Sequence, residues 1–156
     1  EGIRWFMERR SIKRRKKVII CELKAAGKQI ETIEQAISFC STQLSQGVRP
    51  KGTISLLMAV GYDRYFPEVY EHYSAREREC LVFIYGELFD IRDALNAFPD
   101  DVDEQLIKFR TRGTYDKNEE YCRRLMSIRL RVENVKNTLG LFLINDIEAC
   151  HRTLHN

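Results

Sequence analysis

Proline and long apolar runs are scarce in this sequence. Only three prolines (Pro50, Pro67 and Pro99) interrupt 156 residues, so long tracts are free to form helices. The longest candidate span near the start, IRWFM, is far shorter than the roughly 20 apolar residues that cross a bilayer. We therefore expect neither a signal peptide nor a transmembrane span within these residues.

Cysteine motifs are also missing. Five cysteines are widely separated, odd in number and without a CxxC pair, which excludes a disulfide framework and a zinc-thiolate cluster. Free thiols suit a reducing compartment. We expect buried or half-buried structural cysteines at positions 21, 40, 80, 122 and 150, and no motif singles out a reactive one.

Catalytic signatures are absent as well: there is no GxSxG, no glycine-rich phosphate loop and no HExxH. Glu148 and His151 have the Glu-x-x-His spacing of di-iron bundles, with His155 one turn further on. Such a site needs two of these motifs, and the chain has one. We expect a protein that is not an enzyme and has no metal or cofactor. A helical metal-binding protein is the least favoured alternative.

What the sequence does contain is hydrophobic periodicity. With 44% hydrophobic and 31% charged residues, the composition is typical of a charge-rich helical protein of one domain. Spacings that alternate between 4 and 3 predict helices with one buried stripe. The first seam contains Ile19, Leu23, Ala26, Ile30, Ile33, Ile37, Cys40 and Leu44. Gly47 and Pro50 are expected to end that helix.

Two further seams follow. The second contains Leu81, Ile84, Leu88, Ile91, Leu95 and Phe98; it starts after a capping-box pair, Ser74 and Glu77, and is expected to stop at Pro99. Because CLVFIYGELF is apolar on more than one face, we predict that this helix is the central one. The third contains Tyr121, Leu125, Ile128, Val132, Val135, Leu139 and Phe142, and drifts near Gly140 into a stripe of Leu143, Ile147, Cys150 and Leu154.

Shorter helices are expected in the two connections, around residues 53–60 and 67–73 and near 101–110, the last with Asp100 as its cap. The prediction is an all-α fold: a bundle of three long helices with additional short helices and coiled-coil-like packing. Residues 18–156 would form this single bundle domain. Such periodicities occur in many unrelated bundles, so they do not identify a function.

Positive charge is concentrated at one end. Residues 1–17 have eight Lys or Arg against two Glu, whereas the remainder has 18 basic and 21 acidic residues. Aromatic side chains precede the cations in a way typical of the cytoplasmic flank of a membrane helix. The candidate interface residues are Trp5 and Phe6, and the candidate contacts to anionic lipid or phosphate are Arg9, Arg10, Lys13, Arg14, Arg15, Lys16 and Lys17.

We therefore predict that residues 1–17 are a basic, juxtamembrane leader continuous with the first helix. A membrane span would precede Glu1, and the leader would lie against the inner leaflet on the cytoplasmic side. The bundle would act in protein interaction, scaffolding or sensing, with a homodimer possible. The alternatives are a soluble protein that binds nucleic acid through this arm, and a basic helix start that is merely solvated.

An aromatic cluster lies in the first connection. Tyr62, Arg64, Tyr65 and Tyr70 are candidates for a partner surface, since tyrosine and arginine are enriched at interfaces. Alternatively, Tyr62, Phe66, Val69 and Tyr73 cap one end of the core.

Overall fold

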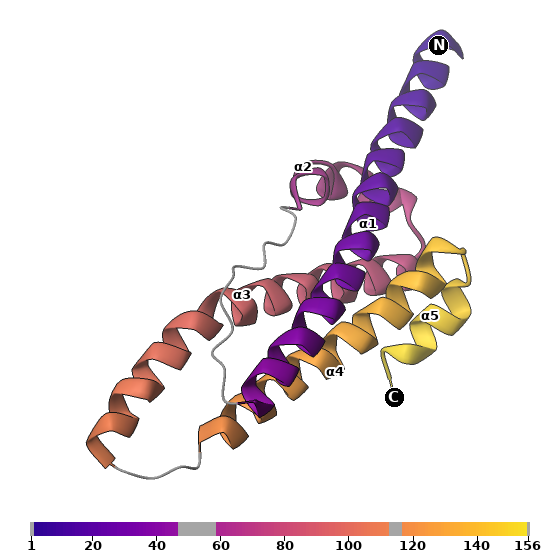
Figure 1. Ribbon diagram of the computed structural model, residues 1–156. Coiled ribbons are helices and arrows are strands. Elements are labelled where there is room, and N and C mark those ends of the chain that lie inside the picture. The colour runs from indigo at the N-terminus through magenta and orange to yellow at the C-terminus, as the bar shows by residue number, and fades with distance from the viewer. Residues whose placement is uncertain (1, 47–58, 113–116, 156) are drawn as a thin grey trace.

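The computed structural model describes residues 2–46, 59–112 and 117–155, without the side chains of residues 44, 98–112 and 117–121. These residues form α1 (Gly2–Ser45), α2 (Val60–Val69), the short 3-10 helix η1 (Tyr70–His72), α3 (Ala75–Arg112), α4 (Lys117–Leu143) and α5 (Ile147–Thr153) (Figure 1). The described ranges contain no strand, so the predicted all-α class is confirmed.

The three seams form the core. Up to Phe142, every seam residue with a described side chain is buried except Cys40, which is half-buried. In the stripe that follows, Cys150 is buried and Leu143, Ile147 and Leu154 are half-buried. Leu44, Phe98 and Tyr121 lie outside the described side chains. Because a buried leucine, isoleucine or valine stabilises the fold by about 1.5–3 kcal/mol relative to an exposed one, these stripes dominate folding.

The central helix is α4, which packs against α1, α3 and α5. The prediction that the second long helix is central was wrong. Although CLVFIYGELF is largely apolar, Val82 in α3 is 52% exposed and Phe83 and Phe89 are only half-buried. Helix α3 therefore has more apolar side chains in this stretch than its buried face can hold.

Helix α3 does not stop at Pro99 but continues to Arg112. The expected stop, and a separate helix near 101–110 capped by Asp100, were therefore wrong. Proline lacks one N–H donor and costs about 3 kcal/mol in a helix interior. That cost falls on one turn, and the helix continues through it. At the other end, the capping box is confirmed: Ser74 N–H donates to Glu77 Oε2 at 2.7 Å and Glu77 N–H donates to Ser74 Oγ at 3.2 Å.

The last helix is broken where a continuous stripe was expected. Asn145 has φ 63°, in the left-handed region that asparagine tolerates. Its N–H donates to Phe142 O and the Asp146 N–H donates to Leu141 O, the two bonds of a Schellman motif that ends α4. Asp146 then caps α5 by accepting a bond from the Ala149 N–H. The chain turns here, so Cys150 is buried by the separate helix α5 and not by a continuation of α4.

The helix predicted over 67–73 was misplaced, because α2 begins at Val60 and Pro67 lies in its last turn. Most of the helix predicted over 53–60 lies outside the described residues. Gly61 explains how α2 approaches α1 so closely. A Cβ at this position would meet Glu22 Oε2 and Val18 Cγ1 at 3.0 Å each.

Candidate functional site

The basic leader is the most exposed part of the described chain. Residues 2–17 belong to α1, and the start of this helix projects past α2, away from the other helices (Figure 1). All residues from 2 to 10 are exposed. Ile3, Trp5, Phe6 and Met7 are 79%, 57%, 54% and 66% exposed, an unusual density of large apolar side chains in water. We call residues 2–17 the arm.

The aromatic side chains of the arm lie beside its cations. The Arg9 guanidinium is 4.3 Å from the Trp5 ring centroid, and that of Arg10 is 4.9 Å from the Phe6 ring centroid. Both contacts are cation–π pairs one helical turn apart. We call residues 3–7 the tip of the arm. Its aromatic rings are thus followed, one helical turn later, by the guanidinium groups of Arg9 and Arg10.

Two of the seven predicted contact cations are instead attached to the folded body. Arg15 pairs with Glu68 of α2 at 3.0 Å. Lys16 donates to the backbone carbonyl of His72, and its ammonium lies 3.9 Å from the Tyr73 ring centroid. The remaining five, Arg9, Arg10, Lys13, Arg14 and Lys17, are exposed. The arm is therefore fixed in direction at its base, a role that its sequence did not reveal.

Just below this base, Glu22 holds α2 in place. Its carboxylate accepts the N–H groups of Gly61 at 2.6 Å and Tyr62 at 3.0 Å, which are free donors in the first turn of α2. It also accepts the Tyr85 hydroxyl at 2.7 Å. Burial, followed by the bond to Glu22, raises the pKa of Tyr85. The sequence analysis did not predict these contacts of Glu22, because Glu22 and Tyr85 are 63 positions apart and no motif links them.

The aromatic cluster is divided between core and surface. The Tyr62 ring stacks on Tyr85 at 3.8 Å and on Phe66 at 4.6 Å, so Tyr62 is half-buried. Arg64 and Tyr70 are exposed and Tyr65 is half-buried, with the Arg64 guanidinium 5.3 Å from the Tyr65 ring centroid. Arg64, Tyr65 and Tyr70 are thus the members that remain accessible to a partner.

Tyr73, at the end of this segment, is buried and its hydroxyl has no hydrogen-bond partner within the described residues. Burial, and secondarily the charge of Glu77, raises the pKa of Tyr73 to about 12. The phenol therefore stays protonated at neutral pH and contributes bulk to the core.

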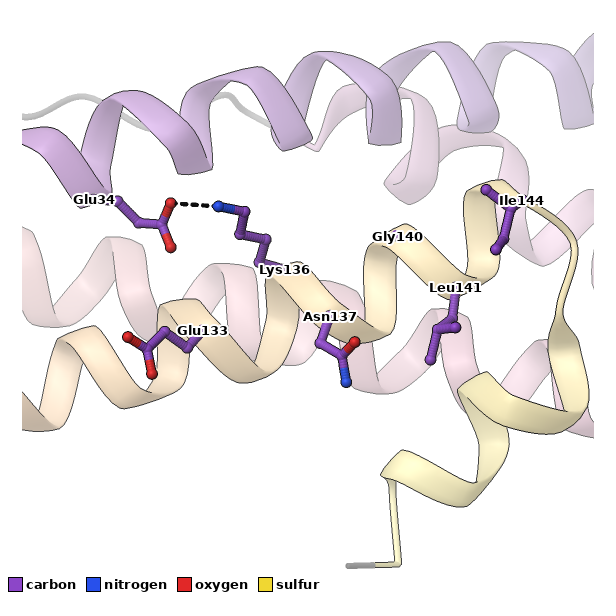
Figure 2. A pocket seen from close by; sticks show the side chains of 7 residues that line it. All are labelled: Glu34, Glu133, Lys136, Asn137, Gly140, Leu141 and Ile144. Atoms are coloured by element: carbon purple, nitrogen blue, oxygen red, sulfur yellow. Dashed lines mark hydrogen bonds and ion pairs between the residues drawn. The ribbon is translucent and has the colours of Figure 1, made fainter.

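A shallow groove, open to solvent, lies between α1 and α4 (Figure 2). Its lining residues are Glu34, Glu133, Lys136, Asn137, Gly140, Leu141 and Ile144. Lys136 donates to Glu34 at 2.6 Å, and this bond raises the pKa of the Lys136 ammonium. The pair joins α1 to α4 across the groove, and its side chains act as an exposed ion pair.

The cysteines differ in exposure: Cys80 and Cys150 are buried, Cys40 is half-buried, and Cys21 and Cys122 are exposed. The expectation of buried or half-buried cysteines was therefore wrong for the last two. Burial raises the pKa of Cys40, Cys80 and Cys150, which disfavours the reactive thiolate. In addition, Cys150 Sγ donates to the Thr138 carbonyl at 3.4 Å.

The Glu-x-x-His spacing does not bring its two residues to one site. Glu148 pairs with Arg76 of α3, whereas His151 contacts Glu79 of α3 at 2.5 Å. Adjacent turns of α5 thus form two separate polar contacts with α3. The sequence could not show which glutamate His151 contacts, because Glu79 is 72 positions away.

None of the described helices has a stretch long and apolar enough to cross a membrane. Comparisons of the chain with models of protein families, with curated proteins and with solved structures found no match.

Proposed function

We propose that this chain is the cytoplasmic, non-enzymatic bundle of a membrane-anchored protein, and that its arm occupies the headgroup layer of the inner leaflet. The observation that supports this most strongly is the exposed tip, where four large apolar side chains (Ile3, Trp5, Phe6 and Met7) accompany a single cation, Arg4. Exposed cations follow along the same helix from Arg9. Interfacial aromatics followed by Lys and Arg are typical of the cytoplasmic edge of a membrane helix. A membrane span would precede the tip.

The order of residues along the arm favours a particular orientation. Successive residues are about 100° apart around a helix, so the run from Arg9 to Lys17 distributes charge over all sides. A helix lying flat needs an apolar face and a polar face. Here the division is mainly along the axis: residues 3–7 are apolar apart from Arg4, and residues 9–17 are basic. This favours a helix that passes end-on through the headgroups over one that lies flat.

The length of the arm fits this arrangement. Trp5 lies ten residues before Arg15, the first cation attached to the body. At 1.5 Å per residue, this separation is about 15 Å. The headgroup region on each side of a bilayer is roughly 5–8 Å thick. The tip can therefore reach the acyl boundary while α2 and the bundle stay in water.

The bundle itself would bind protein. We propose that its three long seams pack in coiled-coil fashion, since their 3.5-residue spacing coincides with burial. Arg64, Tyr65 and Tyr70, close to the base of the arm, would form the partner surface. A homodimer is one form that this interaction could take, and light scattering of the purified chain tests it.

Trp5 offers a direct test of membrane binding, because it is the only tryptophan in the chain. Vesicles of phosphatidylcholine with phosphatidylserine should shift its fluorescence to shorter wavelength, and vesicles of phosphatidylcholine alone should do so much less. Neutralising Arg14 and Lys17 with glutamine should weaken partitioning roughly 30-fold, because each cation contributes about 1 kcal/mol near an anionic surface.

The matched control is Lys24→Gln with Lys28→Gln, which removes the same charge from two exposed positions further along α1. This variant should bind vesicles like the parent. Equal weakening by both pairs would mean that net charge, and not the arm, drives binding. If anionic vesicles leave Trp5 unchanged while duplex DNA binds in a salt-dependent way that Arg14→Gln with Lys17→Gln abolishes, the nucleic-acid function replaces the membrane one.

A further inference from the structure

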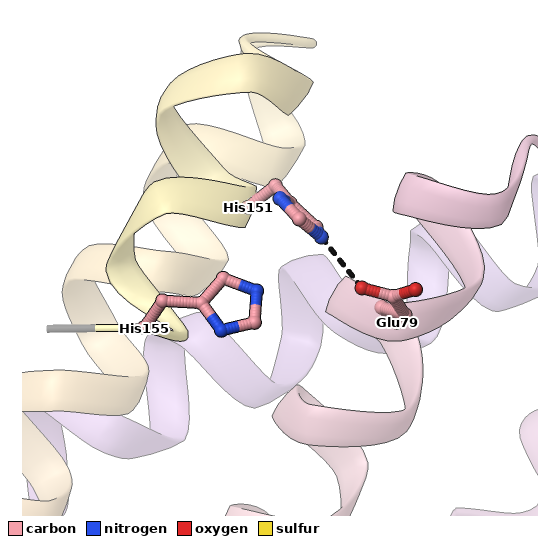
Figure 3. Close-up of side chains that lie close together, drawn as sticks. All are labelled: Glu79, His151 and His155. Atoms are coloured by element: carbon pink, nitrogen blue, oxygen red, sulfur yellow. Dashed lines mark hydrogen bonds and ion pairs between the residues drawn. The ribbon is translucent and has the colours of Figure 1, made fainter.

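A cluster of metal-binding side chains lies at the junction of α3 and α5, and it does not depend on the proposed membrane function. Glu79 of α3, His151 of α5 and His155 just beyond α5 each place one donor atom within 4.8 Å of the others (Figure 3). Two of the three histidines in the chain are therefore in one place. We propose that these three residues bind a divalent transition-metal ion, with Zn²⁺ the best match.

The two histidines converge because of helical spacing. His151 and His155 are four residues apart, so they lie on the same side of the chain one turn apart. Their ring centroids are 4.9 Å apart. Figure 3 shows both rings on the side that faces α3, where Glu79 projects toward them.

Glu79 and His151 are already in contact. His151 Nε2 lies 2.5 Å from Glu79 Oε2, and the His151 side chain is only 23% exposed. The salt bridge between Arg76 and Glu148 crosses the same junction and helps to hold α5 beside α3. Two of the three donors are thus held by the fold before any ion arrives.

The third donor has room to adjust. Tetrahedral ligands at the Zn–N distance of about 2.0–2.1 Å are roughly 3.4 Å apart, closer than the 4.8 Å limit that encloses the three donors. His155 is exposed, in the turn that follows α5. Rotation of its side chain can therefore bring its donor atom closer. The Glu79 carboxylate, whose side chain is 57% exposed, must also turn so that its 2.5 Å contact with His151 Nε2 opens to the same spacing.

The donor set selects the class of ion. Two imidazoles and one carboxylate suit Zn²⁺ and its transition-metal neighbours, whereas Ca²⁺ and Mg²⁺ prefer oxygen ligands only. Three protein ligands leave a fourth position of a tetrahedral zinc ion for water or another ligand. Since the site joins α3 to α5, a bound ion would also fasten the last helix onto the bundle.

Isothermal titration with ZnCl₂ tests the proposal. Because exposed thiols also bind zinc, the parent protein for this test carries Cys21→Ser and Cys122→Ser. We expect one Zn²⁺ per chain and a rise in melting temperature with added zinc. His155→Ala should weaken binding about tenfold or more, since even the loss of an outer-shell partner weakens metal affinity by about 10–100-fold.

His72→Ala is the matched control, because it removes the remaining exposed histidine from a different part of the molecule. Its zinc affinity should equal that of the parent. A second pair compares Glu79→Gln, which should weaken binding, with Glu71→Gln at an exposed position of η1, which should not. A parent that binds no zinc would overturn the proposal. So would His155→Ala binding as tightly as the parent, or His72→Ala weakening binding equally.

Discussion

Tyr73 and Tyr85 are both buried, but their hydroxyl groups have different surroundings. The Tyr85 hydroxyl donates to Glu22, which also caps α2, whereas the Tyr73 hydroxyl has no partner within the described part of the chain. A buried hydroxyl without a partner costs about 1–3 kcal/mol, and a bond to a charged group contributes about 1.5–3 kcal/mol. The two residues should therefore respond oppositely to the same substitution.

Tyr85→Phe should lower the free energy of unfolding by about 1.5–3 kcal/mol, because it removes the donor from Glu22. Tyr73→Phe should raise it by roughly 1 kcal/mol, since it removes only an unpaired hydroxyl and keeps the ring that Lys16 contacts. Urea unfolding followed by circular dichroism measures both. Destabilisation by Tyr73→Phe would show that its hydroxyl has a partner after all.

At the scale of the element, two helical glycines have different neighbours. A Cβ at Gly27 in α1 would lie 3.6 Å from Leu139 Cδ2, an ordinary van der Waals distance, whereas one at Gly61 in α2 would press on Glu22 and Val18 at 3.0 Å. Glu22 cannot yield without lengthening the bonds that it accepts from α2. One position therefore has room for a methyl group, and the other does not.

Gly27→Ala should stabilise the protein by about 0.5–1 kcal/mol, because alanine is the better helix former in a helix interior. Gly61→Ala should destabilise it by about 1–3 kcal/mol through overpacking at the cap of α2. Thermal unfolding of the two variants beside the parent checks the opposite signs. Equal effects would mean that α2 does not approach α1 as closely as the structure has it.

Element ends show where sequence patterns are informative. The capping box at Ser74 and Glu77 is a local motif and was predicted correctly. The turn at Asn145 and Asp146 was missed, although asparagine favours the left-handed conformation and aspartate favours an N-cap, because the apolar stripe seemed to continue through it. Pro99 gave the opposite error: proline is a strong local signal for a helix end, but α3 continues past it to Arg112.

At the scale of the whole molecule, the arm divides into a free part and an anchored part. Residues 2–10 are exposed, while Arg15 and Lys16 contact α2, η1 and Tyr73. We therefore expect membrane binding and folding stability to depend on different residues of one helix.

Deleting residues 1–10 should change the melting temperature by less than about 2 °C, because exposed residues contribute little to stability. The same deletion removes the aromatic tip with Arg4, Arg9 and Arg10, so it should strongly weaken co-sedimentation with anionic vesicles, while Lys13, Arg14 and Lys17 keep some binding. Deleting residues 1–17 should in addition lower the melting temperature measurably, since it removes the contacts of Arg15 and Lys16. A large loss of stability from the shorter deletion would contradict the division.

By itself, the sequence determined that this protein is helical, which residues line its three seams, and that its positive charge gathers at one end. These properties depend on spacing and composition along the chain, which a helix converts directly into faces and ends. Only the tertiary structure decided that α4 is central, that Glu22 binds α2, and that Glu79 meets the two histidines. Such pairings join residues far apart in sequence, and they arise only when packed helices fix which side chains come within hydrogen-bonding distance.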